Sequence, residues 1–406
     1  MLVVGAGPAG SAAAYHLARA GLDVLLADRA TFPREKVCGD GLTPRGVRAM
    51  MRMGVDPAEP GFTRVEGLRT YGVGGTVLDL RWPREGPFPP VGVVRTRLEL
   101  DHLLAARAER AGARFLQGAE ATRPLLDRTG WVSGAELRTQ DGALAVRSRF
   151  VVAADGAASR FAAQAGVVRD GSCPMGVAAR RYYRIPRPQQ AVLEAFVNLP
   201  APGGGVMAGY GWIFPLGGDL VNVGAGLLNT YRGFGALSAR ALLESFVRGL
   251  PEAWGVTEER AVGPVRSGPI PMGFNRRPVA VPGLLLVGDA AGATNPFNGE
   301  GIAYAIETGE LAAELIAEAV ARGRPALAQL YPTVLRQRYG KYYFVGRQWS
   351  RMIGHPWFMG LAVRHGFPRR TLMRFALSFM ANLVDGDRSS LSGRLARALV
   401  ALAPEG

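Results

Sequence analysis

The sequence predicts an α/β fold, because two strand–turn–helix units of the same kind stand far apart in the chain. The first ten residues run an apolar strand into a Gly-x-Gly-x-x-Gly turn and an alanine-rich helix, and a second apolar strand (24–27) ends in Asp28. Far downstream, the apolar run 284–287 ends in Gly288-Asp289 and leads through a glycine-rich loop into another alanine-rich helix. Strand, glycine turn, helix and acid in this order are typical of a Rossmann dinucleotide site.

The three glycines of the first turn have separate expected roles. Gly5 allows the tight turn, Gly7 lets the backbone approach a pyrophosphate, and Gly10 lets the helix pack closely on the strand. The helix N-terminus then offers free N–H groups and a positive dipole end to the phosphates. Asp28 is placed to accept hydrogen bonds from an adenosine ribose. We therefore predict dinucleotide binding here rather than a chance glycine-rich turn.

Three further segments resemble those of the glutathione-reductase-like flavoproteins. Gly288-Asp289 resembles their Gly-Asp motif, in which the acid binds the ribityl chain of FAD and the next helix points its N-terminus at the flavin. Residues 151–160 resemble the Asp-Gly motif of the hydroxylase-like branch, and Arg97 matches the arginine that this branch keeps near the flavin. Singly, each is also a common strand-to-turn junction. Together and in order, they imply a glutathione-reductase-like, hydroxylase-type FAD-binding Rossmann domain.

The resemblance also implies which residues contact the cofactor, FAD. The residues expected to bind it are Gly5, Gly7, Ala9, Gly10, Asp28, Arg29, Cys38, Gly39, Arg97, Asp155, Gly156, Gly288, Asp289, Gly299, Gly301 and Ile302.

The pattern along the chain predicts an interrupted FAD-binding domain. We expect it to cover 1–175, with an excursion into a substrate domain near 60–95, and to resume over 271–330. Between 176 and 270 the chain changes to short β-rich segments separated by glycine and proline, which predicts an antiparallel substrate-domain sheet. The remainder, 331–406, is expected to be helical.

Composition limits the class of protein. A chain of 406 residues that is 48% apolar can build two domains with a substantial core. It has no apolar run of the ~20 residues needed to cross a bilayer. Because the first strand starts at Met1, we expect no cleavable leader. The two cysteines, Cys38 and Cys173, make no metal-binding spacing, so we expect no metal and a reduced, cytoplasmic protein.

The formal net charge of +15 is unevenly distributed. Residues 341–400 hold ten Lys or Arg against two acids, Asp385 and Asp387, interleaved with large apolar side chains. Such a segment suits a peripheral position on an anionic membrane, at its inner face, but it equally suits a helical cap with a buried apolar side. Nucleic acid is not an expected partner, because no reader motif accompanies the charge.

Two further segments look like the geranylgeranyl reductase family. They are 32–42, which contains Cys38-Gly-Asp-Gly, and 209–215, which is similar to that family's Tyr-x-Trp-x-Phe-Pro substrate motif. Within that family, the residues of these two segments are most similar to those of the actinobacterial menaquinone reductases, which saturate one isoprene double bond of the quinone tail. The resemblance implies a polyprenyl substrate and an FAD-dependent reduction of a carbon–carbon double bond.

The chemistry of such a reduction assigns roles within these segments. An isolated alkene has no carbonyl to hold developing charge, so one route protonates one carbon and quenches the resulting cation with hydride. Cys38 and Tyr210 are the candidate acids, and Trp212 is the third candidate catalytic residue, because aromatic faces can stabilise the cation. The candidate substrate-binding residues are Tyr210, Trp212, Phe214 and Pro215. Cys38 could instead be a small buried thiol, and the three aromatic residues could be ordinary sheet core.

Other functions and partners stay open at this point. A flavin-dependent monooxygenase or halogenase shares the cofactor motifs, although a halogenase would carry Trp-x-Trp-x-Ile-Pro in place of 210–215 and a hydroxylase would lack the Cys-Gly-Asp-Gly segment. No second Gly-x-Gly-x-x-Gly turn exists, so the electron donor is either NAD(P)H that binds transiently or a ferredoxin-like carrier. Arg34, Lys36 and Arg45 are candidates for holding a diphosphate or phospholipid headgroup, with solvated surface as the alternative.

Overall fold

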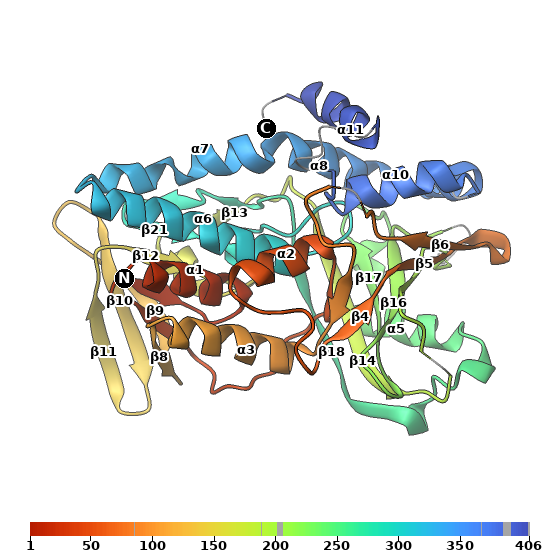
Figure 1. Ribbon diagram of the computed structural model, residues 1–406, viewed down its shortest axis with the longest axis horizontal. Helices are drawn as coiled ribbons and strands as arrows, with labels where there is room; N and C mark the ends of the chain where they lie inside the picture. The colour runs from red at the N-terminus through yellow and green to blue at the C-terminus, as the bar shows by residue number, and fades with distance from the viewer. Residues whose placement is uncertain (85, 188, 201–205, 367, 385–390, 405–406) are drawn as a thin grey trace.

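The computed structural model describes all 406 residues except 85, 188, 201–205, 367, 385–390 and 405–406. A six-stranded sheet with the order β20-β21-β12-β1-β2-β8 organises the cofactor half of the molecule (Figure 1). Its strands pair in parallel, except for β20 with β21 at one edge. The bounds are β1 (Leu2–Val4), β2 (Leu25–Asp28), β8 (Arg114–Gln117), β12 (Val151–Ala153), β20 (Ala280–Val281) and β21 (Leu284–Leu286).

The parallel pairing brings three distant segments to one edge of this sheet. Val4 pairs in register with Ala153, which pairs with Leu286, so the residues that follow these three strands gather at the same end. In open α/β sheets, ligands bind outside the carboxyl ends of the strands. The fold therefore places the glycine turn, the Asp-Gly motif and the Gly-Asp motif around one ligand position, and the predicted Rossmann unit is confirmed.

Helices α1 (Pro8–Arg19), α3 (Arg97–Arg110) and α6 (Ile302–Ala321) accompany this sheet. Alanine and glycine let α1 and α6 approach closely, since a Cβ added at Gly309 would lie 2.2 Å from the carbonyl oxygen of Ala9. This close packing holds the N-termini of both helices at the ligand edge of the sheet.

A seven-stranded sheet with the order β18-β14-β17-β16-β15-β5-β6 forms the second half. Neighbours are antiparallel except for β15 and β5, which run parallel, so the sheet is not antiparallel throughout. That pair is parallel because β5 comes from the early excursion of the chain rather than from a hairpin with β15. The bounds are β5 (Gly67–Tyr71), β6 (Val77–Arg81), β14 (Met175–Arg184), β15 (Leu193–Phe196), β16 (Gly209–Pro215), β17 (Leu220–Leu228) and β18 (Ala261–Pro271), and α5 (Ala239–Arg248) packs on the sheet.

Smaller sheets and two short helices complete the first 300 residues. The sheets have the orders β11-β10-β9, β3-β7-β4 and β13-β19. Their strands are β3 (Gly41–Leu42), β4 (Thr63–Val65), β7 (Gly92–Val94), β9 (Glu120–Leu126), β10 (Val132–Thr139), β11 (Gly142–Arg147), β13 (Val168–Arg169) and β19 (Arg276–Arg277), and the helices are α2 (Pro44–Arg52) and α4 (Arg160–Gln164).

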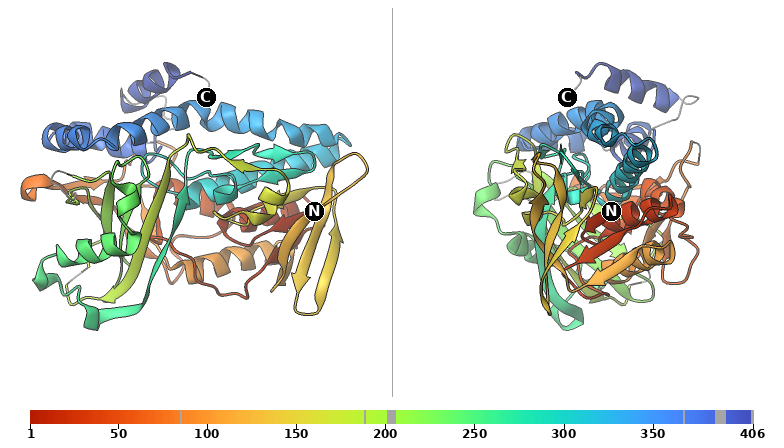
Figure 2. Two further views of the ribbon diagram at one scale, coloured as in Figure 1. Left: turned by 180° about the vertical axis from the view of Figure 1, so that it is seen from behind. Right: turned by 90° about the vertical axis from the view of Figure 1, so that its left-hand side faces the viewer.

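The chain ends in α7 (Tyr331–Leu335), α8 (Lys341–Ile353), α9 (Pro356–Leu361), α10 (Arg370–Met380) and α11 (Leu391–Ala401). Helices α7, α8 and α10 run along one long side of the molecule, above both large sheets (Figure 1, Figure 2). In the described part of the chain, no helix is both long and apolar enough to span a membrane. Asp385 and Asp387, which enter the charge count of the basic segment, lie outside the described residues.

A buried ion pair between α2 and α6 holds the C-terminal segment through hydrogen bonds with Asn382 and Tyr339. Arg45 of α2 and Glu307 of α6 are fully buried, with Nη2 and Oε2 at 2.8 Å. Arg45 also donates to the carbonyl oxygen of Asn382 at 3.0 Å, and Tyr339 donates to Glu307 at 2.8 Å. Burial opposes ionisation of Glu307, yet the Arg45 charge leaves its pKa below the usual value. Neither surface exposure nor a headgroup role fits Arg45, so both predictions for this residue are wrong.

Candidate active site

A cavity of about 1220 Å³ starts at the glycine turn, passes between the two large sheets and continues beneath α8 and α10. The predicted site residues that line it are Gly5, Gly7, Ala9, Asp28, Arg29, Cys38, Gly39, Arg97, Asp155, Gly156, Tyr210, Trp212, Phe214, Asp289, Gly299, Gly301 and Ile302. Three others, Gly10, Pro215 and Gly288, do not line it. The fold thus gathers most of the predicted residues around one space.

The three glycines of the turn differ in what a side chain would meet, which is protein backbone at two of them and the cavity at the third. Gly5 has a φ of 98°, and a Cβ there would stand 2.4 Å from the carbonyl oxygen of Ala154. A Cβ at Gly10 would stand 1.7 Å from the carbonyl oxygen of Gly5. At Gly7 the nearest atom is Nη2 of Arg34 at 3.5 Å, and the residue borders the cavity. Gly5 and Gly10 are therefore needed by the turn itself, whereas Gly7 leaves room for a phosphate group.

Asp28, the last residue of β2, holds the glycine turn through a hydrogen bond and also borders the cavity. Its carboxylate accepts hydrogen bonds from the backbone N–H of Ala6 at 2.7 Å and of Ala30 at 2.9 Å. A carboxylate has about four acceptor positions, so it can still receive ribose hydroxyls. The next residue, Arg29, is exposed at the rim of the cavity. The Arg34 guanidinium forms ion pairs with the carboxylates of Asp28, at 3.7 Å between Nη2 and Oδ2, and of Asp101, at 3.0 Å between Nη1 and Oδ2.

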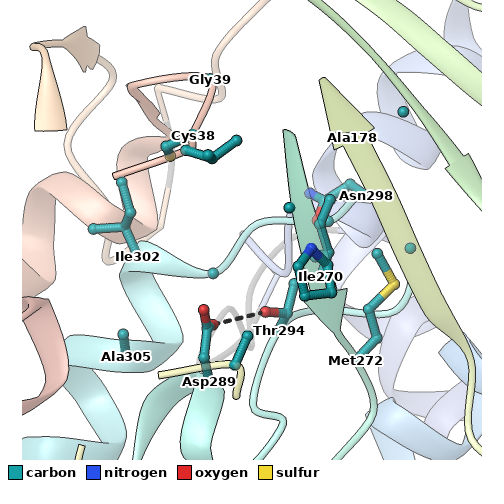
Figure 3. Close-up of a pocket in the computed structure, with 18 of the residues that line it drawn as sticks. Cys38, Gly39, Ala178, Ile270, Met272, Asp289, Thr294, Asn298, Ile302 and Ala305 are labelled. Atoms are coloured by element: carbon teal, nitrogen blue, oxygen red, sulfur yellow. Dashed lines mark hydrogen bonds between the residues drawn. The ribbon is translucent and has the colours of Figure 1, made fainter. Parts of the chain in front are cut away.

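Two more aspartates follow strands of the same sheet. Asp155 accepts from the Ser159 hydroxyl at 2.8 Å and the Phe161 N–H at 3.2 Å, while burial raises its pKa. Asp289 accepts from the Thr294 hydroxyl at 3.4 Å (Figure 3). Both carboxylates border the cavity and can receive further hydroxyl donors.

The N-terminus of α6 closes this part of the cavity. Gly299, Gly301 and Ile302 all border it, and the first turn of the helix carries no acidic residue. The positive end of the helix is thus left uncompensated by the helix's own side chains, which suits an electron-rich ring edge. Figure 3 shows Ile302 on the same wall as Cys38, with Met272 across the space. Phosphate, ribose, ribityl and ring positions therefore all have suitable residues, and the set fits FAD. Within the described chain no cluster of three or more His, Cys, Asp or Glu could hold a metal.

Cys38 is half-buried and borders the cavity. Burial is the main reason that the pKa of its thiol is raised; the Asp40 carboxylate raises it further, and the Arg97 guanidinium opposes both. Arg97 is itself held by two hydrogen bonds to Asp101, at 2.6 and 2.9 Å. At neutral pH the thiol is protonated and can donate a proton into the cavity.

Three aromatic side chains from alternate positions of β16 border the cavity in a row. The ring centres of Tyr210 and Trp212 are 5.8 Å apart, and those of Trp212 and Phe214 are 6.2 Å apart. The Tyr210 hydroxyl donates to the carbonyl oxygen of Asn298 at 3.1 Å, and burial raises its pKa to about 12. Pro215 ends the strand outside the cavity, because a position one residue beyond Phe214 faces the other side of the sheet.

Residues that the sequence reasoning missed place Trp212 and the Cys38 segment. A Cβ at Gly224 of β17 would lie 2.0 Å from the Trp212 ring, so only glycine leaves room for the indole. Asn222 of the same strand accepts from the Trp212 indole N–H at 2.9 Å, and it donates to the Asp40 carboxylate at 2.7 Å. The visible signal was Gly224-Ala-Gly226 inside a β-pattern, since an internal strand glycine often marks a close approach.

Beyond the aromatic row the cavity becomes apolar. Its lining there includes Ile270 and Met272 of the second half and Trp349, Met352, Met373 and Phe379 of the C-terminal helices. Met352 and Leu372 border the cavity and are also 43% and 47% exposed at the surface. The apolar arm therefore reaches the surface between α8 and α10.

Comparisons with known proteins agree with an FAD-binding fold. A family model described as an FAD binding domain matches residues 1–199. A menaquinone reductase of Mycobacterium tuberculosis (strain CDC 1551 / Oshkosh) is 41% identical over 389 residues, which are 95% of this chain and 92% of that one. A digeranylgeranylglycerophospholipid reductase of Methanothermobacter thermautotrophicus is 30% identical over 84% of this chain and 83% of its own. A solved structure, described as geranylgeranyl bacteriochlorophyll reductase-like and from Thermoplasma acidophilum, has a TM-score of 0.78 at 25% identity and covers 98% of both chains.

Proposed function

Because this chain belongs to the geranylgeranyl reductase family of FAD-dependent oxidoreductases, we propose that it saturates a double bond in the isoprenoid tail of menaquinone. The observation that carries the proposal is the continuity of the cavity. One space joins the FAD-binding edge of the sheet to an apolar arm, and Cys38 and the aromatic row stand where the two meet. An apolar arm of this kind fits a polyprenyl chain rather than a polar substrate.

The chain's own residues divide the work around FAD, which supplies a hydride to carbon when it is bound and reduced. Gly7 and the N-terminus of α1 border the place for the pyrophosphate, and Asp28 the place for the ribose. Asp289 and the N-terminus of α6 border the places for the ribityl chain and the ring. An external electron donor must restore the reduced form after each turnover.

The second hydrogen arrives as a proton from a side chain. Cys38 and Tyr210 both border the cavity, and both have raised pKa values, so each is protonated at neutral pH. Transfer of one proton to one alkene carbon leaves a carbocation on the other carbon, which a hydride then quenches. The faces of Tyr210, Trp212 and Phe214 stabilise such a cation by roughly 0.5 to 2 kcal/mol each, provided that water stays out.

The test is anaerobic turnover with a defined substrate panel. Dithionite-reduced protein is incubated with menaquinones, prenylated phospholipids and prenyl diphosphates, and the products are analysed by mass spectrometry. We expect the gain of two hydrogens in the tail of menaquinone. Oxygen-dependent hydroxylation of the same compounds, with no anaerobic hydrogen gain, would instead place the protein among the monooxygenases.

We further propose that the surface around the opening of the apolar arm rests on an anionic membrane. Trp357 and Leu361 of α9 are 70% and 51% exposed, close in sequence to the exposed cavity residue Met352. Residues 341–380 contain no Asp or Glu, while Arg351, Arg364, Arg369, Arg370 and Arg374 are exposed. Exposed apolar side chains surrounded by arginine suit the headgroup region of an anionic bilayer. Such a position would let a prenyl tail enter without crossing water.

A further inference from the structure

Asp40 is a buried carboxylate between the flavin-binding edge and the second sheet that the mechanism above does not use. It is fully buried and has a φ of 68°, in the left-handed region that residues other than glycine rarely adopt. Backbone of this kind persists only where several contacts hold it in place. The residue follows Cys38 by two positions, so whatever holds Asp40 also holds the thiol segment.

Three donors from three different elements converge on the Asp40 carboxylate. The backbone N–H of Arg97, at the start of α3, donates to Oδ1 at 3.1 Å. The Tyr182 hydroxyl of β14 and the Asn222 amide of β17 donate to Oδ2 at 2.8 and 2.7 Å. Every one of these partners donates, so the carboxylate can accept a hydrogen bond from each of them, and these bonds oppose the effect of burial on its charge.

Asn222 extends the network to both candidate reaction partners. Its amide N–H₂ group also donates to the carbonyl oxygen of Cys38 at 2.9 Å, and its amide oxygen accepts from the Trp212 indole at 2.9 Å. The Cys38 segment also packs directly against the aromatic row, since a Cβ at Gly39 would be 3.2 Å from the Phe214 ring. One amide therefore fixes the thiol segment and the aromatic row relative to each other.

We propose that Asp40 is a positioning residue that sets Cys38 and Trp212 in register through Asn222 and whose charge balances that of Arg97 beside the thiol. Arg97 faces both Asp40 and Cys38 and is also paired with Asp101, and Arg180 faces Asp40 and is paired with Glu35. Removal of the Asp40 carboxylate therefore leaves less negative charge beside the thiol while the Arg97 cation stays in place. A cation favours the thiolate. The thiolate has no proton to give, so Asp40 keeps Cys38 in the form that the proposed function requires.

The first measurement of the test reports on the thiol directly and needs no substrate. In a Cys173→Ala background, the FAD-loaded protein is alkylated with iodoacetamide across a pH series, with and without Asp40→Asn. We expect the variant to reach half-maximal alkylation rate about one pH unit lower than the parent. Turnover with the best substrate should fall roughly tenfold to a hundredfold in kcat with little change in KM, because the apolar arm is untouched.

Two further variants separate position from charge. Asp79→Asn is the matched control, since it makes the same chemical change at an exposed ion pair on β6 and should leave the alkylation profile unchanged. Asn222→Ser removes the amide that links Asp40, the Cys38 backbone and Trp212. The loss of kcat in the Asp40→Asn/Asn222→Ser double variant should be smaller than the two single effects combined, because both residues act through one network. If Asp40→Asn loses FAD, a normal kcat in FAD-loaded Asn222→Ser protein would still overturn the positioning role.

The inference rests on the proposed function, but the alkylation profile distinguishes a failure of the inference from a failure of that function. Superimposed alkylation profiles for Asp40→Asn and the parent, with equal kcat, would overturn the inference. If instead Cys38→Ala retains full turnover while Asp40→Asn shifts the alkylation profile, the assignment of Cys38 as the acid fails and the electrostatic role of Asp40 stands.

Discussion

Gly7 differs from the other glycines of its turn because a side chain there would meet a ligand rather than the protein. A Cβ at Gly7 finds no protein atom closer than 3.5 Å, whereas one at Gly10 would overlap backbone at 1.7 Å. We expect Gly7→Val to fold and to lose bound FAD, as measured by absorbance of the purified, desalted protein. Gly171→Val should keep its FAD, because a Cβ there has open space and the residue does not border the cavity. Stoichiometric flavin in folded Gly7→Val protein would contradict the assignment of the turn.

Cys38 and Tyr210 are competing proton donors, and single substitutions distinguish them. Both side chains act after the cofactor is bound, so Cys38→Ala and Tyr210→Phe should keep FAD. Loss of the true donor is expected to lower kcat by about 10² to 10⁴, and loss of the other by much less. Single-turnover oxidation of the reduced flavin by substrate measures this step. If both variants stay within a few-fold of the parent, the proton comes from elsewhere, with solvent as the next candidate.

The charge on Asp40 has a cost in stability that pH can reveal. Burial raises its pKa from 3.8 to about 6 in the folded protein, although Asn222 and Tyr182 donate to it and Arg97 and Arg180 face it. The stability that its neutral form contributes is fully present below pH 3.8 and is lost as the pH rises through about 6. A shift of this size corresponds to roughly 3 kcal/mol.

We therefore expect Asp40→Asn to gain free energy of unfolding relative to the parent between pH 4 and pH 7. Urea denaturation at both pH values measures the difference, and other titrating groups, such as Glu300, cancel because both proteins contain them. The buried charge then lowers stability for the sake of function, as is common at active sites. Parallel stability curves for the two proteins across this range would refute the prediction.

The residues found from sequence alone are those whose chemistry is local. The glycine turn and Asp28 can be recognised within the first thirty residues, and Gly288-Asp289 follows the apolar run 284–287. The role of Asp40 cannot be predicted from the Cys38-Gly-Asp-Gly segment alone, because its partner Asn222 is 182 positions away. The burial of Arg45 cannot be predicted for the same reason, since its partner Glu307 is 262 positions away and no pattern near Arg45 indicates burial.

At the scale of elements, β16 and β17 act as one unit. Alternation along β16 predicts that Tyr210, Trp212 and Phe214 share a face, and all three border the cavity. What alternation cannot predict is the neighbour that makes room for a large ring. Gly224 pairs with Trp212 across the two strands, and its missing side chain is the space that the indole fills.

Gly224→Ala should therefore displace Trp212 while leaving the cofactor edge of the first sheet intact. We expect normal FAD content and a loss of kcat of about tenfold or more, because a small misplacement at a reacting centre is costly. Gly171→Ala is the control, since a Cβ there would meet no atom within 4 Å and Gly171 does not border the cavity. Equal kcat values for the two variants would show that the position of Trp212 does not matter for turnover.

At the scale of the whole molecule, the C-terminal helices link the cofactor half to the second half and also cover the apolar arm (Figure 2). The sequence left two interpretations of this segment open, a membrane surface and a helical cap. Its buried side, with Tyr342, Tyr343 and Phe379, packs as a cap does. Its exposed apolar and arginine side chains lie on the same elements, so capping and membrane binding are compatible functions of one segment.

Membrane binding predicts a specific dependence on charge. Each buried CH₂ of a prenyl tail is worth about 0.8 kcal/mol, so a tail of several isoprene units stays in the bilayer unless the protein collects it there. Binding to anionic vesicles should weaken with added salt and with the double change Arg369→Glu/Arg370→Glu, as measured by co-sedimentation. Turnover of a short, soluble prenyl substrate should survive the double change, because neither arginine borders the cavity.

The control is an equal charge change far from the opening. Arg128 and Arg149 are exposed beside β9, β10 and β11, at the opposite end of the molecule from α10 (Figure 1). Because screening confines attraction to charges near the lipid surface, Arg128→Glu/Arg149→Glu should leave vesicle binding almost unchanged although it alters the net charge equally. If the two double variants lose binding to the same extent, attraction follows net charge rather than an oriented surface. Equal binding of the parent to neutral and anionic vesicles, unaffected by salt, would leave the C-terminal segment as a helical cap alone.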